Sequence, residues 1–138
     1  DMQREADQCV EICESLAPSG MVDCQSLPVS HIVQAMEKVH EMFHAAMDVF
    51  LSHDVDRARQ ICTDDDVVDE AFGKIVLEVC NAITQHPENV MHDVDLLFII
   101  KYVERMGDHA TNIAEWVIYM VTGVHPDLNE GETLQVVQ

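Results

Sequence analysis

Apolar residues recur every three to four positions along most of residues 30–122, which is the period of one face of an α-helix. The pattern is interrupted in two places, near residues 53–54 and near residues 87–89. Ser30 is a candidate cap for the first of the three runs, and Gly123 follows the last run as a stop signal. The sequence therefore predicts three long helices, and no segment has the alternation of a strand.

Three long helices joined by short breaks can bury their apolar stripes only by packing antiparallel, so we expect an all-α antiparallel three-helix bundle. The stripe of the first helix contains Ile32, Met36, Val39, Phe43, Met47 and Phe50. In the bundle interior we expect the last helix to face the middle helix through two sets of residues. The last helix contributes Ile99, Val103, Met106, Ile113 and Val117, and the middle helix contributes Ile61, Val68, Phe72 and Val79.

The chain opens directly in helical sequence, without a capping signal. Its segment "READQCVEICE" matches "RMGDHATNIAE" of the last helix at the Arg, Asp, Ile and Glu positions. We therefore expect the opening helix to close a preceding, truncated copy of the same bundle. The expected organisation is the closing helix of a truncated repeat at 1–19, a linker at 20–28, a three-helix bundle at 29–123 and an acidic, disordered tail at 124–138.

The charge balance restricts the possible partners. Seven Lys and Arg residues against 26 Asp and Glu residues give a formal net charge of −19, which repels phosphate backbones and anionic lipid. We therefore expect no nucleic-acid binding, and we expect cations or a basic protein surface as companions. No apolar run approaches the roughly 20 residues of a membrane span, so no membrane insertion is expected. Five cysteines without framework spacing indicate reduced thiols and a cytoplasmic location.

Two pairs of carboxylates lie beside the apolar stripes of neighbouring helices. Glu104 and Asp108 are four residues apart, so both side chains project from one side of the last helix. On the middle helix, Asp65 interrupts the apolar stripe, and Asp69 follows one turn later. A carboxylate in a core stripe costs several kcal/mol of desolvation unless it is paired or bound to a cation. The four side chains are therefore expected to converge as a metal site.

Other interpretations of these carboxylates remain open. An acidic chain produces such pairs by chance, and Lys101 or Arg105 can satisfy Glu104 in a surface salt bridge. If a cation binds, all-oxygen ligands suit Mg, Mn, Ca or iron better than a structural zinc ion. The His of the ferritin-like di-iron signature is replaced by Gly107, and His109 points about 100° away around the helix. No nucleophile or phosphate-loop motif accompanies the carboxylates, so an enzyme is not expected.

The sequence "YVERMGDHATNIAEWVIYMVTG" closely resembles the closing helix of the PhoU family, whose hallmark is Glu/Asp-xxx-Asp followed by Asn-Ile. The segment "DDDVVDEAF" is similar to the second-helix counterpart of that motif. The resemblance covers residues 29–123, and the opening helix fits the end of a first repeat. It implies two similar three-helix bundles, of which the second is complete here.

The resemblance also implies a function. A PhoU-like protein would be a cytoplasmic, dimeric, metal-binding adaptor that negatively modulates a high-affinity phosphate ABC transporter and the sensor histidine kinase of the phosphate regulon. Its metal (Mg, Mn, Fe or Zn, with the identity open) would be bound by Asp65, Asp69, Glu104 and Asp108. The first-repeat motif departs from the family pattern, because Gln3 stands in the place of Glu104 and leaves Asp7 alone. A carboxylate-bridged metalloenzyme and a metal-free helical partner-binding module are the alternatives.

Overall fold

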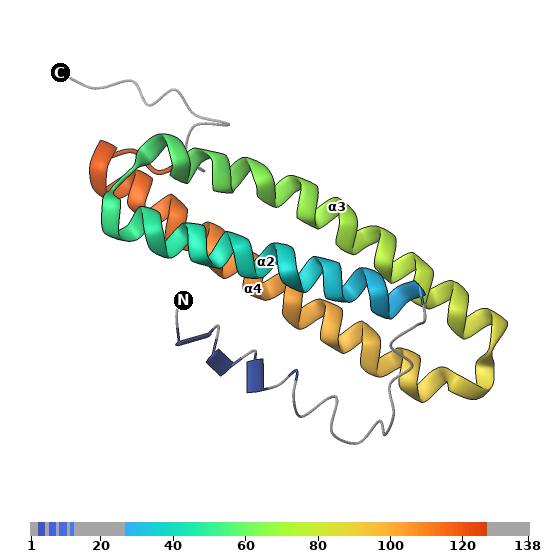
Figure 1. The fold of residues 1–138 in the computed structure, drawn as a ribbon. Coiled ribbons are helices and arrows are strands. Elements are labelled where there is room, and N and C mark those ends of the chain that lie inside the picture. Colours follow the sequence, from blue (N-terminus) through green and yellow to red (C-terminus); the bar gives the residue numbers. More distant parts are fainter. Residues whose placement is uncertain (1–2, 5, 8, 11, 13–26, 127–138) are drawn as a thin grey trace, which may run out of the picture.

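Three long helices run side by side along the whole length of the molecule (Figure 1). The structure is a computed structural model that describes residues 3–4, 6–7, 9–10, 12 and 27–126. Within these residues there is no strand, so the predicted all-α antiparallel three-helix bundle is confirmed. The elements are α2 (Leu27–Ser52), α3 (Val55–Gln85), the short 3-10 helix η2 (Pro87–Asn89) and α4 (Val90–Thr122).

The first helix begins earlier than the sequence indicated. We expected Ser30 to cap it, and this was wrong, because α2 already begins at Leu27 and contains Ser30. Pro28 is compatible with this earlier start, since the first N–H groups of a helix have no partner within the helix and proline lacks only that group. The proline is thus part of the first turn and does not separate a linker from the helix.

The turns between and after the helices have the expected chemistry. Only His53 and Asp54 separate α2 from α3, and His53 has a left-handed backbone with φ of 58°. The Asp54 carboxylate caps α3 by accepting a hydrogen bond from the Arg57 backbone N–H at 3.0 Å. Gly123 ends α4 with φ of 73°, and its N–H donates to the Tyr119 carbonyl at 2.8 Å. Both predicted breaks and the glycine stop are therefore confirmed.

The interior between α3 and α4 is built as the stripes predicted. The four α3 positions are buried, and so are all the α4 positions except Met106, which is only partly buried. The buried stripe residues are Ile61, Val68, Phe72 and Val79 of α3 and Ile99, Val103, Ile113 and Val117 of α4.

The buried face of α2 differs from the predicted stripe. Met36 and Phe50 are each 39% exposed, so their assignment to the core was wrong, and Phe43 and Met47 are only partly buried. At four of six places the buried residue is the one just before the predicted residue. The buried set is Ile32, Ala35, Val39, Met42, Ala46 and Val49. This face mixes two alanines with larger aliphatic side chains, and the column next to it, which holds Met36 and Phe50, is more exposed.

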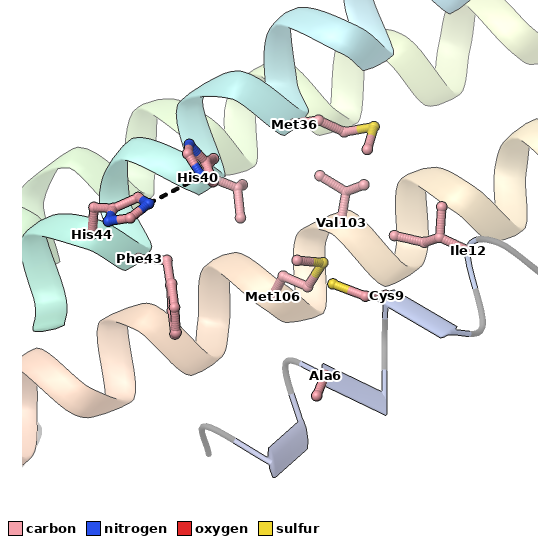
Figure 2. A pocket seen from close by; sticks show the side chains of 10 residues that line it. Ala6, Cys9, Ile12, Met36, His40, Phe43, His44, Val103 and Met106 are labelled. Carbon is pink, nitrogen blue, oxygen red and sulfur yellow. Dashed lines mark hydrogen bonds between the residues drawn. The ribbon is translucent and has the colours of Figure 1, made fainter.

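The opening segment faces that more exposed column of α2, and also α4, across a groove of about 600 Å³ (Figure 2). Its described residues are helical, and Ile12 is buried in the same core as the bundle. The remaining residues of the predicted units 1–19 and 20–28, and the tail beyond residue 126, lie outside the described residues. None of the described helices combines the length and the hydropathy of a bilayer span.

Candidate metal centre

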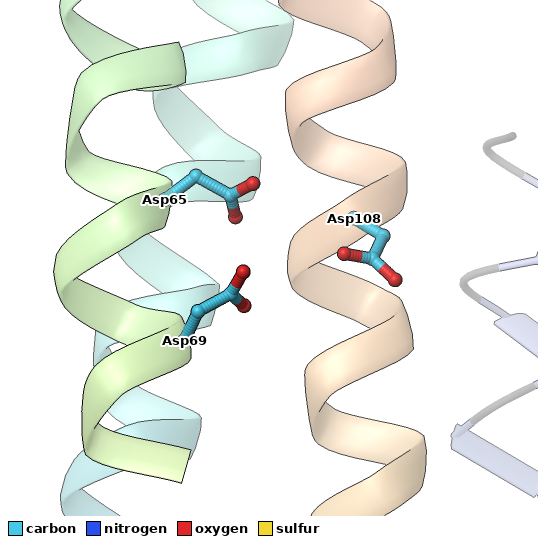
Figure 3. Close-up of side chains that lie close together, drawn as sticks. All are labelled: Asp65, Asp69 and Asp108. Atoms are coloured by element: carbon cyan, nitrogen blue, oxygen red, sulfur yellow. The ribbon is translucent and has the colours of Figure 1, made fainter. Parts of the chain in front are cut away.

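A group of three carboxylates lies where α3 passes α4 near the middle of the bundle (Figure 3). Asp65 and Asp69 project from successive turns of α3, and Asp108 projects toward them from α4. One oxygen from each carboxylate lies within 4.8 Å of one oxygen of each of the other two. Three negative charges therefore share a volume that one cation can occupy.

Asp65 is the member of this group that comes nearest to the core. It lies on α3 between the buried residues Ile61 and Val68, and it is partly buried, whereas Asp69 and Asp108 are exposed. A β-carbon added to Gly107 of α4 would lie 3.9 Å from Asp65 Oδ1 and 3.6 Å from the side chain of Val39. The Asp65 carboxylate is thus held at the surface of α4, beside a residue that has no side chain.

Burial and mutual repulsion make the three carboxylates harder to ionise. Burial raises the pKa of Asp65 to about 6, and the charges of Asp69 and Asp108 add to this increase. The pKa values of Asp69 and Asp108 are also raised. The first cause is partial desolvation of these mostly exposed side chains by the neighbouring helix, and the next is the charge of neighbouring carboxylates, Asp108 acting on Asp69 and Glu104 acting on both. The carboxylates of the site therefore repel one another, and a bound cation would relieve this repulsion.

Thr111 belongs to the site and was not singled out from the sequence. Thr111 is buried, and its hydroxyl donates a hydrogen bond to the Gly107 carbonyl at 3.1 Å. A hydrogen bond from the same hydroxyl to Asp65 would oppose the increase in the Asp65 pKa. One hydroxyl hydrogen cannot serve both acceptors at once. The signal was present, because residues 104, 107, 108 and 111 have the spacing of one helix face.

Glu104 does not join the group of three, although the sequence analysis placed it with the other ligands. Its carboxylate accepts a hydrogen bond from Lys101 Nζ at 2.8 Å, in an ion pair on the surface of α4. This is the salt bridge that the sequence left open as an alternative. The charge of Glu104 still raises the pKa values of Asp69 and Asp108, so the carboxylate lies at the edge of the site.

His109 lies on another side of α4, as its position next to Asp108 predicted. It is buried, and burial lowers its pKa, with the positive charge of Arg4 from the opening segment as the next cause. Among the described residues, no other set of three His, Cys, Asp or Glu side chains gathers as closely as Asp65, Asp69 and Asp108. The donors are all carboxylate oxygens, which fit Mg, Mn, Ca or iron in the divalent state.

The opening segment does not supply a comparable group within the described residues. Gln3 and Asp7 are exposed and helical, and they lie one turn apart. The expected weakness of the first-repeat motif remains a prediction, because part of that segment lies outside the described residues.

Comparison with known proteins identifies the family to which this chain belongs. Residues 32–117 match the sequence profile of the PhoU domain. A phosphate-specific transport system accessory protein PhoU homolog of Clostridium acetobutylicum is 31% identical over 130 residues, which are 94% of this chain and 59% of that protein.

Two more relatives have the same name. The one from Rhizobium meliloti is 38% identical over 113 residues, covering 81% of this chain and 46% of that protein. The one from Burkholderia is 30% identical over 125 residues, covering 89% and 53%. The chain thus spans about half the length of the curated relatives it matches. No solved structure matches the chain significantly.

Proposed function

Since the chain belongs to the PhoU family, we propose that it is a metal-binding regulatory adaptor of phosphate homeostasis. The observation that carries the proposal is the convergence of Asp65, Asp69 and Asp108 from two helices. The names of the relatives, accessory proteins of a phosphate-specific transport system, support the physiological part of the proposal.

The cation would be bound by the three aspartates, with Glu104 as a fourth ligand once its side chain leaves Lys101. Without a cation, the repulsion between the clustered carboxylates opposes folding. With a cation bound, each carboxylate is attracted to the cation and the folded state is stabilised. Mg, Mn or Fe fits the oxygen donors best, whereas a tetrahedral zinc site would use His or Cys ligands that this cluster lacks among the described residues. In this proposal the cation holds α3 and α4 in one register.

The partners would be the ATPase of a phosphate ABC transporter and the sensor histidine kinase of the phosphate regulon, both negatively modulated in the cytoplasm. The net charge of −19 supports a docking mode in which acidic helix surfaces meet basic patches on these proteins. The proposed active form is a homodimer of two-repeat chains. In that form the residues described here would contribute the second repeat and the closing helix of the first.

An adaptor function also fits the chemistry of the acidic cluster. No His or Cys lies in the cluster among the described residues, so the mixed ligand set of oxygen-activating di-iron sites is absent there. We therefore propose binding without turnover. Hydrolysis of phosphate esters or consumption of oxygen by the Mn- or Fe-loaded protein would favour the metalloenzyme alternative.

Thermal unfolding tests the metal site. The midpoint should rise with millimolar Mg or Mn and fall back with chelator, because binding to the folded state alone is stabilising. Asp65→Asn combined with Asp108→Asn should abolish the response to the cation. Asp64→Asn is the matched control, since Asp64 lies next to Asp65 but its carboxylate accepts a hydrogen bond from Gln60 at 2.9 Å, away from the cluster. A wild-type midpoint that ignores both cation and chelator would remove the metal from the proposal.

Association kinetics test the adaptor. The protein should bind the purified transporter ATPase and the kinase domain, and the association rate should fall as salt rises from 50 to 500 mM, because salt screens steering charges. The Asp65 and Asp108 double variant separates the two parts of the proposal, since it shows whether partner binding requires the cation. Failure to bind either partner with the metal present would contradict the adaptor function while leaving the metal site intact.

A further inference from the structure

A pair of histidines on α2 forms a second cluster of possible metal ligands, on a different helix from the acidic residues. His40 and His44 come from the sequence "HEMFH", one turn apart, and both are exposed. Their Nε2 atoms are 3.0 Å apart, and the rings meet edge to face with centroids 4.4 Å apart (Figure 2). The Nε2 atoms of the two imidazoles therefore already lie next to each other.

The separation of these nitrogens matches two ligands of one metal ion. Imidazole nitrogens bind zinc at about 2.0–2.1 Å. Two such bonds to atoms 3.0 Å apart enclose an angle of roughly 91–97° at the metal. That angle is the one between neighbouring ligands in square-planar and octahedral complexes of Cu²⁺ and Ni²⁺, and it is moderately compressed for tetrahedral Zn²⁺. The two exposed rings need to turn so that both lone pairs point at the ion and not along the line between the nitrogens.

The hydrogen bond between the rings can give way to a metal. One Nε2 must carry a hydrogen to donate to the other, so the two rings are in opposite tautomers. Moving that hydrogen to Nδ1 leaves two lone pairs facing one ion, and the pair is exposed, so the lost hydrogen bond is replaced at small cost. The metal would lie to one side of the line between the two Nε2 atoms and would replace the hydrogen bond between them.

The surroundings attract cations. Glu37 and Glu41 line a shallow groove together with His40, and the chain as a whole carries a net charge of −19. Lys38 Nζ lies 3.5 Å from Glu41, in an ion pair whose side chains are both exposed. Glu37 precedes His40 by three residues and His44 by seven, which places it on the same helix face.

We propose that His40 and His44 form a transition-metal site that binds Zn²⁺, Ni²⁺ or Cu²⁺ through the two imidazole nitrogens, with water in the other positions. The site is separate from the proposed carboxylate centre in helix, in ligand type and in the class of metal. Two histidines four apart on a helix are the ligand pair of zinc sites with the His-Glu-x-x-His pattern.

The geometry supports binding and not hydrolysis. Zinc peptidases with this pattern need a third protein ligand and a glutamate next to the bound water. Within the described residues no third His, Cys, Asp or Glu gathers with His40 and His44, and Glu41 is paired with Lys38. The ion would therefore be exchangeable. It would stand at the edge of a second groove, between α2, α4 and the opening segment, which Met36, Phe43 and Met106 line together with the two histidines.

Titration of the full chain, untagged, with Zn²⁺ and Ni²⁺ tests the site. The titration is done in the Asp65→Asn, Asp108→Asn background, so that the acidic cluster does not contribute. One ion should bind per chain in the presence of excess Mg²⁺, and the protein should be retained on immobilised Ni²⁺. His40→Gln and His44→Gln should each weaken binding at least about tenfold, and the double variant should lose retention.

The matched control is the double variant His53→Gln, His86→Gln, which removes two exposed histidines that do not share a helix face. This control should bind Zn²⁺ and Ni²⁺ as tightly as the Asp65→Asn, Asp108→Asn background protein does, and it should be retained equally on immobilised Ni²⁺. Unchanged binding in the His40, His44 double variant would overturn the proposal, and so would equal loss in the control. Circular dichroism of each variant confirms that the helices persist. The Mg²⁺-dependent midpoint in the wild-type background should not change with His40 and His44, so failure of this site and failure of the carboxylate centre can be distinguished.

Discussion

The carboxylate cluster and the histidine pair use the same helical spacing in opposite surroundings. Asp65 and Asp69 lie one turn apart on α3, and a third carboxylate, Asp108, faces them from a packed neighbouring helix. His40 and His44 lie one turn apart on α2, at an open groove. The first pair has raised pKa values because burial and neighbouring charge act together. The comparison shows that helical spacing brings ligands together, whereas the packing around them decides what they cost the fold.

The largest expected effect tests whether the two regions differ in packing. Phe72 is buried beside the α3 carboxylates, and Phe43 is only partly buried beside the histidines. Phe72→Ala should lower the free energy of unfolding by about 3–5 kcal/mol, as for other large core truncations. Phe43→Ala should lower it by roughly 1–2 kcal/mol, because less area is removed from the interior. Urea denaturation measures both, and equal costs would mean that the groove is packed like the core.

The next effect is electrostatic and belongs to the acidic region alone. With chelator present, Asp65→Asn should raise the free energy of unfolding at pH 8 by roughly 1–2 kcal/mol, after allowance for solvent screening. The sign follows from a folded pKa of about 6 against an ordinary value of 3.8. The stability that protonated Asp65 contributes is complete below pH 4 and is lost as pH rises through about 6.

The difference between Asp65→Asn and wild type should therefore vanish near pH 4, and melts at pH 4, 6 and 8 measure it. A gain that is the same at all three pH values would mean that the charge of Asp65 is not the cause.

The glycine inside α4, Gly107, and the glycine that ends α4, Gly123, should respond to alanine with opposite signs. A β-carbon at Gly107 would make only ordinary contacts, at 3.6 and 3.9 Å, so Gly107→Ala should stabilise the helix by about 1 kcal/mol. Gly123 has φ of 73°, so Gly123→Ala should destabilise by about 1–2 kcal/mol through backbone strain. Chemical denaturation of the two variants measures both signs. A loss at Gly107 would show that the acidic site needs more room than the structure gives it.

The smallest effect on stability concerns the boundary of the acidic region. Lys101→Gln removes the partner of Glu104 and should change the free energy of unfolding by no more than about 0.5 kcal/mol. The same change should tighten Mn²⁺ binding, because a positive charge leaves the site and Glu104 becomes available as a ligand. Calorimetric titration with Mn²⁺ measures this. Weaker binding would mean that Lys101 orders the site through its contact with Glu104.

Much of the fold could be predicted because long helical stripes and strong breaks leave few alternatives. The breaks at 53–54 and 87–89 and the stop at Gly123 are local chemistry, and they were found from the sequence. The face of α2 was misassigned, because two apolar columns run side by side there and only the packing of α2 against α3 and α4 decides which column is buried. Periodicity favoured the larger side chains, Met36 and Phe50, whereas the residues just before them, Ala35 and Val49, are buried.

The site could be predicted in part, for a similar reason. Asp65 was identified because it interrupts a stripe, and its convergence with Asp69 and Asp108 followed from antiparallel packing. The orientation of Glu104 could not be decided, since the competing ion pair with Lys101 depends on side-chain geometry. The histidine pair was passed over because solvent-exposed histidines are common, although the His-Glu-x-x-His spacing of residues 40–44 is visible in the sequence.

The two-residue connection at His53 and Asp54 has a consequence for the order in which the chain folds. It closes the α2–α3 hairpin with almost no loop entropy, so this hairpin can form before α4 is available. Helix α4 then packs onto two helices that are already aligned. Contacts of short sequence separation give fast folding, and we expect a single refolding phase on the microsecond to millisecond scale, which rapid-mixing fluorescence of Trp116 can follow. A slow, concentration-independent phase that a prolyl isomerase does not accelerate would contradict this fast assembly.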